Sequence, residues 1–191
     1  DTPLVPDWHL IKPKDSVVRV WAEPIVDKKA GTWRVRIVDG ARGSKNAEPP
    51  NPTYSGAKGI SLFTGLQISD DYIKAKAQAG EMRSALYAVA VKGPRGIEFQ
   101  PPADTDIDAL AAATKELNKQ RAAWEKSGVI PTELYPEVSS DERPRIYGMP
   151  RWADLFSPRQ LLGFGVLSEE LRRLRLEIVK ADGKELGEAV G

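Results

Sequence analysis

The sequence predicts an α+β protein, with a small antiparallel β lobe followed by a helical lobe. Three observations support this fold class. Short runs of β-branched and aromatic residues fill the first hundred positions, between turns rich in glycine and proline. Apolar residues then recur at helical spacing, and the chain closes on one long amphipathic helix. The change of pattern divides the chain into residues 1–102 and 103–191.

Five strands are predicted in the β lobe, each rich in β-branched and aromatic residues. They are Trp8–Ile11, Val17–Val26, Thr32–Val38, Leu86–Val91 and Ile97–Phe99. Between them we expect turns at Lys28–Gly31 and Lys92–Gly96, a long surface loop at Asp39–Ala57 and an apolar hairpin at Ile60–Ile68. Asp71–Ala79 is either a short helix or an extended arm, and its propensity favours the helix.

The helical lobe contains two predicted helices, joined by an irregular, proline-punctuated segment at 130–156. Thr105 and Asp108 form a capping pair for the first helix, and Gly128 ends it. Its apolar stripe is Ile107, Leu110, Leu117 and Trp124. Ser157 and Pro158 give the second helix a strong start signal, completed by Gln160. The stripe of this helix is Leu161, Phe164, Leu167, Leu171, Leu174 and Ile178.

Composition excludes several classes of protein. Twenty-eight basic and 27 acidic residues leave a formal charge of +1, so any contact with nucleic acid requires a local patch. The chain has no cysteine, which excludes disulfides and cysteine-ligated metals, and its one histidine cannot form a zinc site alone. No apolar stretch is long enough to cross a membrane and no signal peptide opens the chain, so we expect a soluble cytoplasmic protein. The non-methionine start suggests a fragment.

Arginines are concentrated late in the chain. Seven fall between Arg143 and Arg175, against three acidic residues. Guanidinium groups bind phosphate oxygens and aromatic rings stack on bases, so a DNA-facing surface is one interpretation. The predicted DNA-binding residues are Arg143, Arg145, Arg151, Trp152 and Arg159. The alternative is solvated helix charge, with Glu169 paired to Arg172 and Arg173, and for 172–175 this or a partner-facing role is preferred.

A sequence resemblance bears on this choice. Residues 147–162 read YGMPRWADLFSPRQLL and resemble the YGM-x-RW-x-DLF-[ST]-PRQLL stretch of the adenine-specific DNA methylases that contain a zinc ribbon, large proteins of restriction and phage-defence gene clusters. Weaker matches follow the same order along nearly the whole chain. They are Pro3–Val5, Trp8, Asp71–Ala75, Ala79–Met82 and Lys92–Gly96.

The resemblance implies a non-catalytic insert. In that family this region lies between the glycine motif for the cofactor and the Asp-Pro-Pro-Tyr motif. The parent protein would transfer a methyl group from S-adenosylmethionine to adenine N6, and its other regions and DNA would be the partners of this chain. No position here matches the family's catalytic or cofactor-binding residues, so none is predicted.

One departure from the family concerns its second zinc knuckle, a Cys-x-x-Cys-Gly. Ser61 and Thr64 stand at the lost cysteine positions, and their hydroxyls do not hold structural zinc as thiolates do. We therefore predict a zinc-free ribbon remnant. The apolar side chains that are expected to replace the metal are Leu62, Phe63, Leu66 and Ile68.

Three features resemble parts of active sites, but each has a structural interpretation. Asn51–Tyr54 lacks the second proline of an adenine-binding Asp-Pro-Pro-aromatic loop, which makes it a plain surface loop. Gly163 and Gly165 lie inside the last helix, where close packing of a neighbour explains them better than a cofactor does. His9 has no nucleophile beside it in the sequence, so we expect a partly buried residue with a backbone partner.

Three functions remain as hypotheses. The first is an insert of a DNA methyltransferase that recognises or positions DNA, or spaces the enzyme's halves. The second is a protein–protein module that docks the methylase onto other defence subunits through the final helix. An independent small enzyme fits poorly, because the sequence offers no credible active site.

Overall fold

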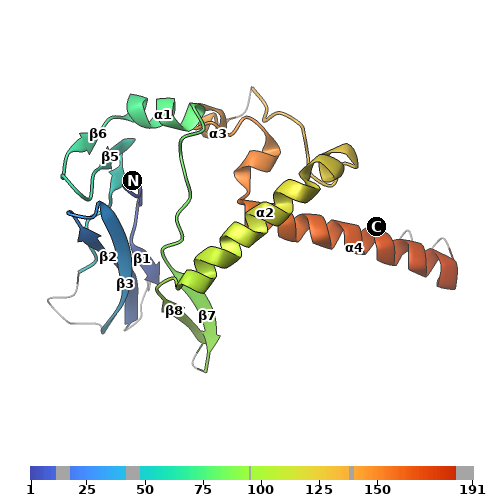
Figure 1. The fold of residues 1–191 in the computed structure, drawn as a ribbon, viewed down its shortest axis with the longest axis horizontal. Helices are drawn as coiled ribbons and strands as arrows, with labels where there is room; N and C mark the ends of the chain where they lie inside the picture. Colours follow the sequence, from blue (N-terminus) through green and yellow to red (C-terminus); the bar gives the residue numbers. More distant parts are fainter. Residues whose placement is uncertain (12–17, 42–47, 95, 138–139, 184–191) are drawn as a thin grey trace. The chain divides into compact units, whose positions relative to one another are not determined.

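A computed structural model of the 191-residue chain describes residues 1–11, 18–41, 48–94, 96–137 and 140–183. The fold is α+β as predicted, with antiparallel strands first and helices after them (Figure 1). The chain divides into two compact units, Asp1–Asp104 and Thr105–Gly191, where the sequence predicted a division after residue 102. Of the sequence predictions, those on Val17, residues 42–47, Arg95 and residues 138–139 lie outside the described residues.

The first unit is built from three small antiparallel sheets, as far as the chain is described. The first sheet contains β1 (His9–Ile11), β2 (Val18–Asp27) and β3 (Thr32–Ala41). The second contains β4 (Tyr54–Ser55), β5 (Lys58–Ile60) and β6 (Gln67–Ile68), and the third β7 (Val89–Gly93) and β8 (Gly96–Gln100). The five predicted strands are confirmed within three residues at each end. Helix α1 (Asp70–Gln78) confirms the helical alternative for residues 71–79.

The core of this unit lies against the long β2–β3 hairpin. The hairpin pairs Val18 with Ala41 at one end and Asp27 with Thr32 at the other, so alternate residues face the same side. Ala22 and Val35 are buried with Trp8, whose ring meets that of Tyr87 edge-on at 6.0 Å between centroids. The Trp8 Nε1–H donates to the carbonyl of Asn51 at 3.1 Å.

Thr53 corrects the prediction of a plain surface loop at 51–54, because this residue is buried. Its hydroxyl donates to the carbonyl oxygen of Pro3 at 2.6 Å and accepts the backbone N–H of Val5 at 2.8 Å. Its own backbone N–H donates to the carbonyl of Val5 at 2.9 Å. The segment therefore fastens the start of the chain, and a buried hydroxyl satisfies backbone groups that have lost water.

The second unit is helical. Its elements are α2 (Asp104–Lys126), α3 (Arg143–Ile146), the 3₁₀ helix η1 (Trp152–Leu155) and α4 (Pro158–Asp182). The prediction that 130–156 is irregular was wrong where α3 and η1 form. Pro144 suits the first turn of α3, and the Asp154 carboxylate accepts the backbone N–H of Arg151 at the start of η1. Both elements are too short to produce a helical period in the sequence.

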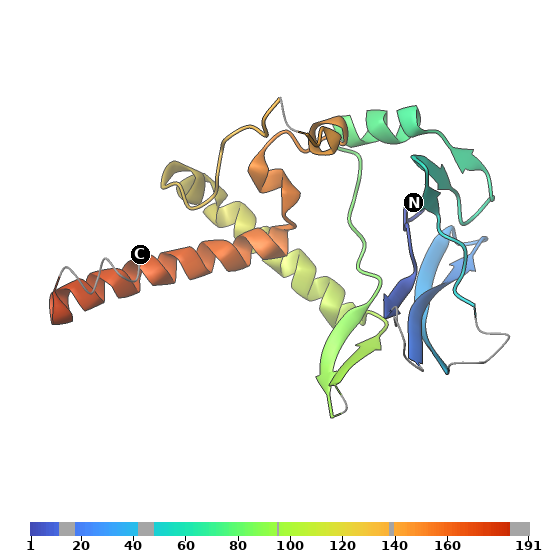
Figure 2. The same ribbon diagram turned by 180° about the vertical axis from the view of Figure 1, so that it is seen from behind.

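Helices α2 and α4 share a core. The two helices cross one another near the start of α4, as the ribbon seen from behind shows (Figure 2). Leu117 and Trp124 of α2 and Leu161 of α4 are buried together with Ile130 and Ala153. The predicted stripe on α2 is buried at Leu117 and Trp124, whereas Leu110 is half-buried and Ile107, near the N-terminal end, is 47% exposed. The start signal of α4 is confirmed. The Ser157 hydroxyl accepts the N–H of Gln160, and the Gln160 side chain accepts the N–H of Ser157.

Two glycines of α4 have different surroundings. A Cβ at Gly165 would overlap the indole ring of Trp124, which confirms close packing there. A Cβ at Gly163 would meet no atom among the described residues, so the same interpretation was wrong for this glycine. Gly165 therefore sets how closely the two helices approach.

The two glycines give a matched test of this packing. We expect Gly165→Ala to destabilise the protein by about 1–3 kcal/mol, because the methyl group forces Trp124 or the helix to move. Gly163→Ala is expected to stabilise it by about 0.5–1 kcal/mol, since alanine costs less entropy than glycine in a helix. Urea unfolding followed by circular dichroism measures both. Changes of the same sign in the free energy of unfolding of the two variants would contradict this packing.

None of the helices among the described residues combines the length and apolar composition needed to cross a membrane.

Candidate nucleic-acid interface

Two of the predicted DNA-binding arginines, on α3, already have carboxylate partners. The Arg143 guanidinium donates to both carboxylate oxygens of Asp141 at 2.7 Å, and this holds the pKa of the Asp141 carboxyl below its ordinary value. Arg145 donates to Glu137 at 3.3 Å. A phosphate would have to compete with these carboxylates. The two arginines are therefore weaker candidates than the sequence suggested.

Arg151 and Arg159 differ from that pair. Both are exposed, and neither guanidinium has a carboxylate partner among the described residues. Arg159 lies in the first turn of α4, which contains no acidic residue. A positive charge at the N-terminal end of a helix opposes the helix dipole, and an anion bound there removes this repulsion. These two arginines are the ones most available to phosphate.

Trp152 presents an exposed aromatic surface next to Arg151. Its side chain is 41% exposed, and its ring packs on Tyr135 at 4.8 Å between centroids with 55° between the planes. Two backbone hydrogen bonds fix this contact: the Trp152 N–H donates to Glu133, and the Tyr135 N–H donates to Pro150. Tyr135 was missed from the sequence, since no spacing links it to Trp152. The pair can offer a stacking platform to an unstacked base.

The arginines in the second half of α4 have different roles. Arg172 donates to the carbonyl of Ser127 at 3.2 Å and so joins α4 to the end of α2. Arg173 pairs with Glu170 and Glu177 on its own helix. The predicted pairing of these two arginines with Glu169 was wrong: Arg173 is bound by Glu170 and Glu177, and Arg172 is directed to the backbone carbonyl of Ser127.

The turn at 61–65, where the sequence resemblance predicts a zinc knuckle without its cysteines, is closed by hydrogen bonds. The Ser61 hydroxyl accepts the backbone N–H groups of Phe63 and Thr64 at 3.2 and 3.3 Å. The Thr64 hydroxyl accepts the N–H of Leu66 at 3.3 Å, and Gly65 takes the positive φ of +71° that the turn needs. The expected packing was wrong for Leu66, whose side chain is exposed. No group of three metal-binding side chains occurs in the described part of the chain.

His9 has a carboxylate partner and not the expected backbone one. Its Nδ1 lies 2.7 Å from Oδ1 of Asp7, which also accepts the His9 backbone N–H. The ring is half-buried at the start of β1. The Asp7 carboxylate therefore contacts both the backbone N–H and the ring Nδ1 of His9. This local arrangement orders the start of the strand.

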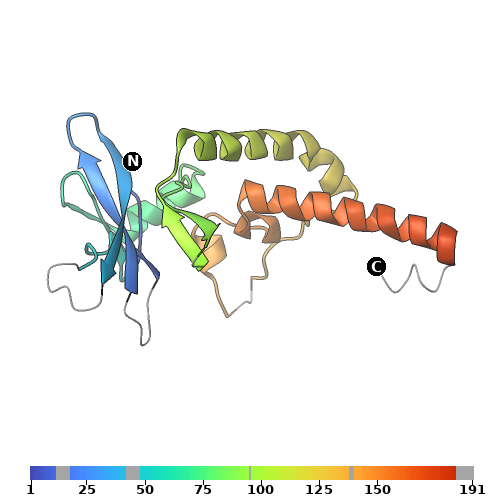
Figure 3. The ribbon, with the colours of Figure 1, turned by 90° about the horizontal axis from the view of Figure 1, so that it is seen from below.

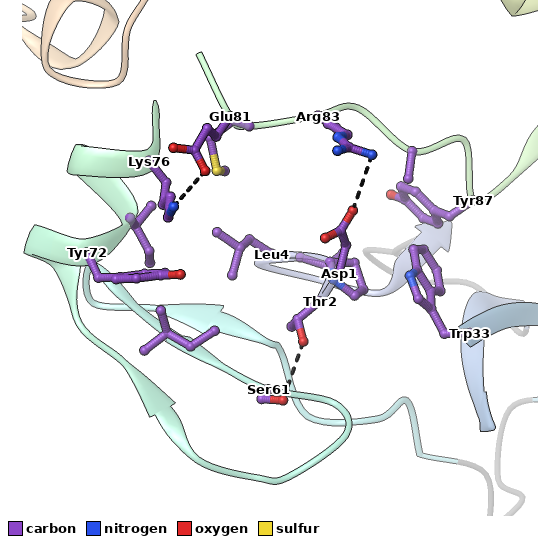
Figure 4. A pocket seen from close by; sticks show the side chains of 16 residues that line it. Asp1, Thr2, Leu4, Trp33, Ser61, Tyr72, Lys76, Glu81, Arg83 and Tyr87 are labelled. Atoms are coloured by element: carbon purple, nitrogen blue, oxygen red, sulfur yellow. Dashed lines mark hydrogen bonds and ion pairs between the residues drawn. The ribbon is translucent and has the colours of Figure 1, made fainter. Parts of the chain in front are cut away.

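The first unit contains a cavity of about 570 Å³ (Figure 4). Trp33, Tyr72 and Tyr87 supply aromatic walls from β3, α1 and the segment before β7. Both basic side chains that line it have a carboxylate nearby: Lys76 pairs with Glu81 at 2.6 Å, and Arg83 lies 3.8 Å from Asp1 in an exposed, weaker pair. No glycine lines the cavity, so it lacks the close backbone approach of a dinucleotide-type cofactor loop. None of the predicted DNA-binding residues lies in it.

Comparison of the chain with protein-family models, curated proteins and solved structures finds no match.

Proposed function

We propose that this chain is a non-catalytic DNA-recognition or DNA-positioning domain of an S-adenosylmethionine-dependent adenine-N6 methyltransferase from a restriction or phage-defence system. The observation that carries the proposal is which of the candidate arginines already have a carboxylate partner and which do not. Arg151 and Arg159 are exposed, have no carboxylate partner within the described part of the chain, and lie on either side of the exposed Trp152 in the sequence. All three lie in residues 147–162, the segment that carries the family resemblance.

The chemistry of these groups suggests contacts to the DNA backbone first. A guanidinium binds phosphate oxygens through two parallel N–H donors, and such contacts fix the position of a protein on the duplex without reading its sequence. With a formal charge of +1, the chain as a whole gives little attraction, so the local groups must supply it. S-adenosylmethionine would be held by other regions of the parent protein, which are the proposed partners of this domain.

Removing the two unpaired arginines tests the proposal. We expect Arg151→Ala/Arg159→Ala to bind duplex DNA about ten- to a hundred-fold more weakly, because each charge-assisted hydrogen bond to phosphate is worth about 1 kcal/mol or more. Fluorescence anisotropy with a labelled duplex of mixed sequence, at fixed low salt, measures the two affinities.

Arg143→Ala is the matched control, since this arginine is held by Asp141. It should change the affinity by less than about three-fold, as rim charges with a partner contribute little. An equal loss in the control and in the double variant would remove the pairing state from the argument. Unchanged binding by the double variant would remove these arginines from the DNA interface.

A docking role is the second candidate, and one observation favours it. Several large apolar side chains of α4 are exposed, which is typical of a surface that a protein partner covers. They are Phe164, Val166, Leu167, Leu171, Leu174 and Leu176. A stable complex with another defence subunit, together with no measurable affinity for DNA, would favour this function over the first.

A further inference from the structure

Helix α4 has two separate stripes. The first faces α2: Leu161 is buried in the core, Gly165 contacts Trp124, and Arg172 donates to Ser127. The second stripe is apolar and exposed, and it lies about a quarter to a third of a turn away around the helix. Leu171 and Leu174 in its middle are 44% and 43% exposed. The second half of α4 extends beyond the end of α2 (Figure 3).

The exposed stripe has the spacing of a coiled coil. Its members alternate in steps of three and four residues, which places them at the a and d positions of consecutive heptads. They are Phe164, Leu167, Leu171, Leu174 and Ile178. Leucine fills both d positions, and Ile178, one of the three a positions, is the β-branched type that favours two parallel strands beside leucine at d. A stripe with this register is built to pair with another helix.

The charges beside the stripe select the partner and its direction. In this register Glu170 takes a g position and Arg175 the following e position. A parallel second copy brings Glu170 of each chain opposite Arg175 of the other, an attractive pair formed twice. The next g and e positions hold Glu177 and Asp182, a like-charge pair at the last residue of α4. An antiparallel copy instead brings Glu170 opposite Glu170 or Glu177 in the registers centred on the stripe, which is repulsive.

We propose that α4 pairs with α4 of a second copy of this chain as a short, parallel, two-stranded coiled coil. Arg175 is exposed and has no carboxylate partner among the described residues, so it is available to the second copy. Glu170 is bound to Arg173 on its own helix at 2.6 Å, and Arg173 retains Glu177 if Glu170 turns toward the partner. Only one attractive pair is formed per side, so most of the association comes from the apolar contacts.

The association is tested by the mass of the 191-residue chain in sedimentation equilibrium over a wide concentration range. The wild type is expected to pass from one to two chain masses as its concentration rises. Leu171→Asp/Leu174→Asp should stay at one chain mass, because it places four carboxylates in the seam. Both side chains are partly exposed in the single chain, and unchanged helical circular dichroism would show that the variant still folds.

The direction of pairing is tested with single cysteines, which the cysteine-free chain makes straightforward. Leu167→Cys and Ile178→Cys are each oxidised separately. In a parallel, in-register pair each cysteine meets its own copy, so both variants should form disulfide-linked dimers. An antiparallel pair can bring only one of the two positions together, so cross-linking of one variant alone overturns the parallel arrangement.

Charge exchange tests the Glu170–Arg175 pairing. Glu170→Arg and Arg175→Glu should each weaken the dimer several-fold, and the double exchange should restore most of the lost affinity. Additive weakening in the double variant would overturn this pairing. A single chain mass for the wild type at every concentration, or a dimer that survives Leu171→Asp/Leu174→Asp, overturns the proposal. The stripe would then belong to another protein or to another surface of this chain.

Discussion

Replacing Trp124 with alanine is expected to cost the second unit about 3–5 kcal/mol of stability. The indole is 2% exposed and packs among Leu117, Ile130 and Leu161. The same ring contacts Gly165 of α4, so removing the indole leaves a cavity between the backbones of α2 and α4. The two helices cannot easily move together to close this cavity. Hydrogen exchange followed by mass spectrometry should show lost protection in α2 and α4, with β2 and β3 retaining theirs.

Two variants control this result. Trp152→Ala removes an indole that is partly exposed, so it should cost far less than Trp124→Ala. Trp124→Phe keeps most of the packing and removes an Nε1–H that has no hydrogen-bond partner among the described residues. Its cost should therefore stay below about 2 kcal/mol. Equal losses of stability in Trp124→Ala and Trp152→Ala would contradict the assignment of Trp124 to the core.

Trp8→Ala is the second large effect expected, again about 3–5 kcal/mol, in the first unit. The ring is 1% exposed and joins the N-terminal segment to the β2–β3 hairpin through Ala22 and Val35. The substitution also removes the hydrogen bond to the Asn51 carbonyl. Hydrogen exchange in β2 and β3 reports the opening of the sheet and so measures the loss of stability.

Trp8→Phe separates packing from hydrogen bonding. Phenylalanine keeps one aromatic ring, but loses the five-membered ring of the indole together with its Nε1–H donor, so about 1–3 kcal/mol is expected. Tyr72→Ala is the surface control, because that ring is exposed on α1. A Trp8→Ala protein that keeps full protection in β2 and β3 would contradict the position of this core.

The features that were predicted correctly depend on residues close in the sequence. Ser157, Pro158 and Gln160 are neighbours, so the capping box of α4 follows from local chemistry alone. The β2–β3 hairpin likewise follows from alternation around a turn at Lys28–Gly31. Local patterns therefore determined the fold class and most element boundaries.

The missed features depend on residues far apart in the sequence. Thr53 is buried because it bonds to Val5 and Pro3, 48 and 50 residues away, and no local pattern shows this. The contact between Tyr135 and Trp152 is also set by tertiary pairing. The candidate DNA-binding residues were found by composition, which counts arginines but does not show which of them have partners. The bond between Arg143 and Asp141 is local enough to have been foreseen.

The candidate DNA-binding arginines differ in whether a carboxylate already binds their guanidinium group. Arg143 and Arg145 are bound by carboxylates, whereas Arg151 and Arg159 have no such partner in the ranges that the structure describes. This difference affects both the expected affinity for DNA and the expected dependence of that affinity on salt concentration. Each arginine that contacts a phosphate releases condensed counterions, so its removal makes binding less sensitive to salt.

The salt dependence of duplex binding is therefore the most direct test of DNA recognition by this domain. The slope of the logarithm of affinity against the logarithm of salt concentration is measured for the wild type and for Arg151→Ala/Arg159→Ala. We expect the slope of the double variant to be shallower by about 2, since each lost phosphate contact removes about 0.9. Parallel slopes, or a wild-type chain without salt-dependent binding, would contradict a role in DNA recognition.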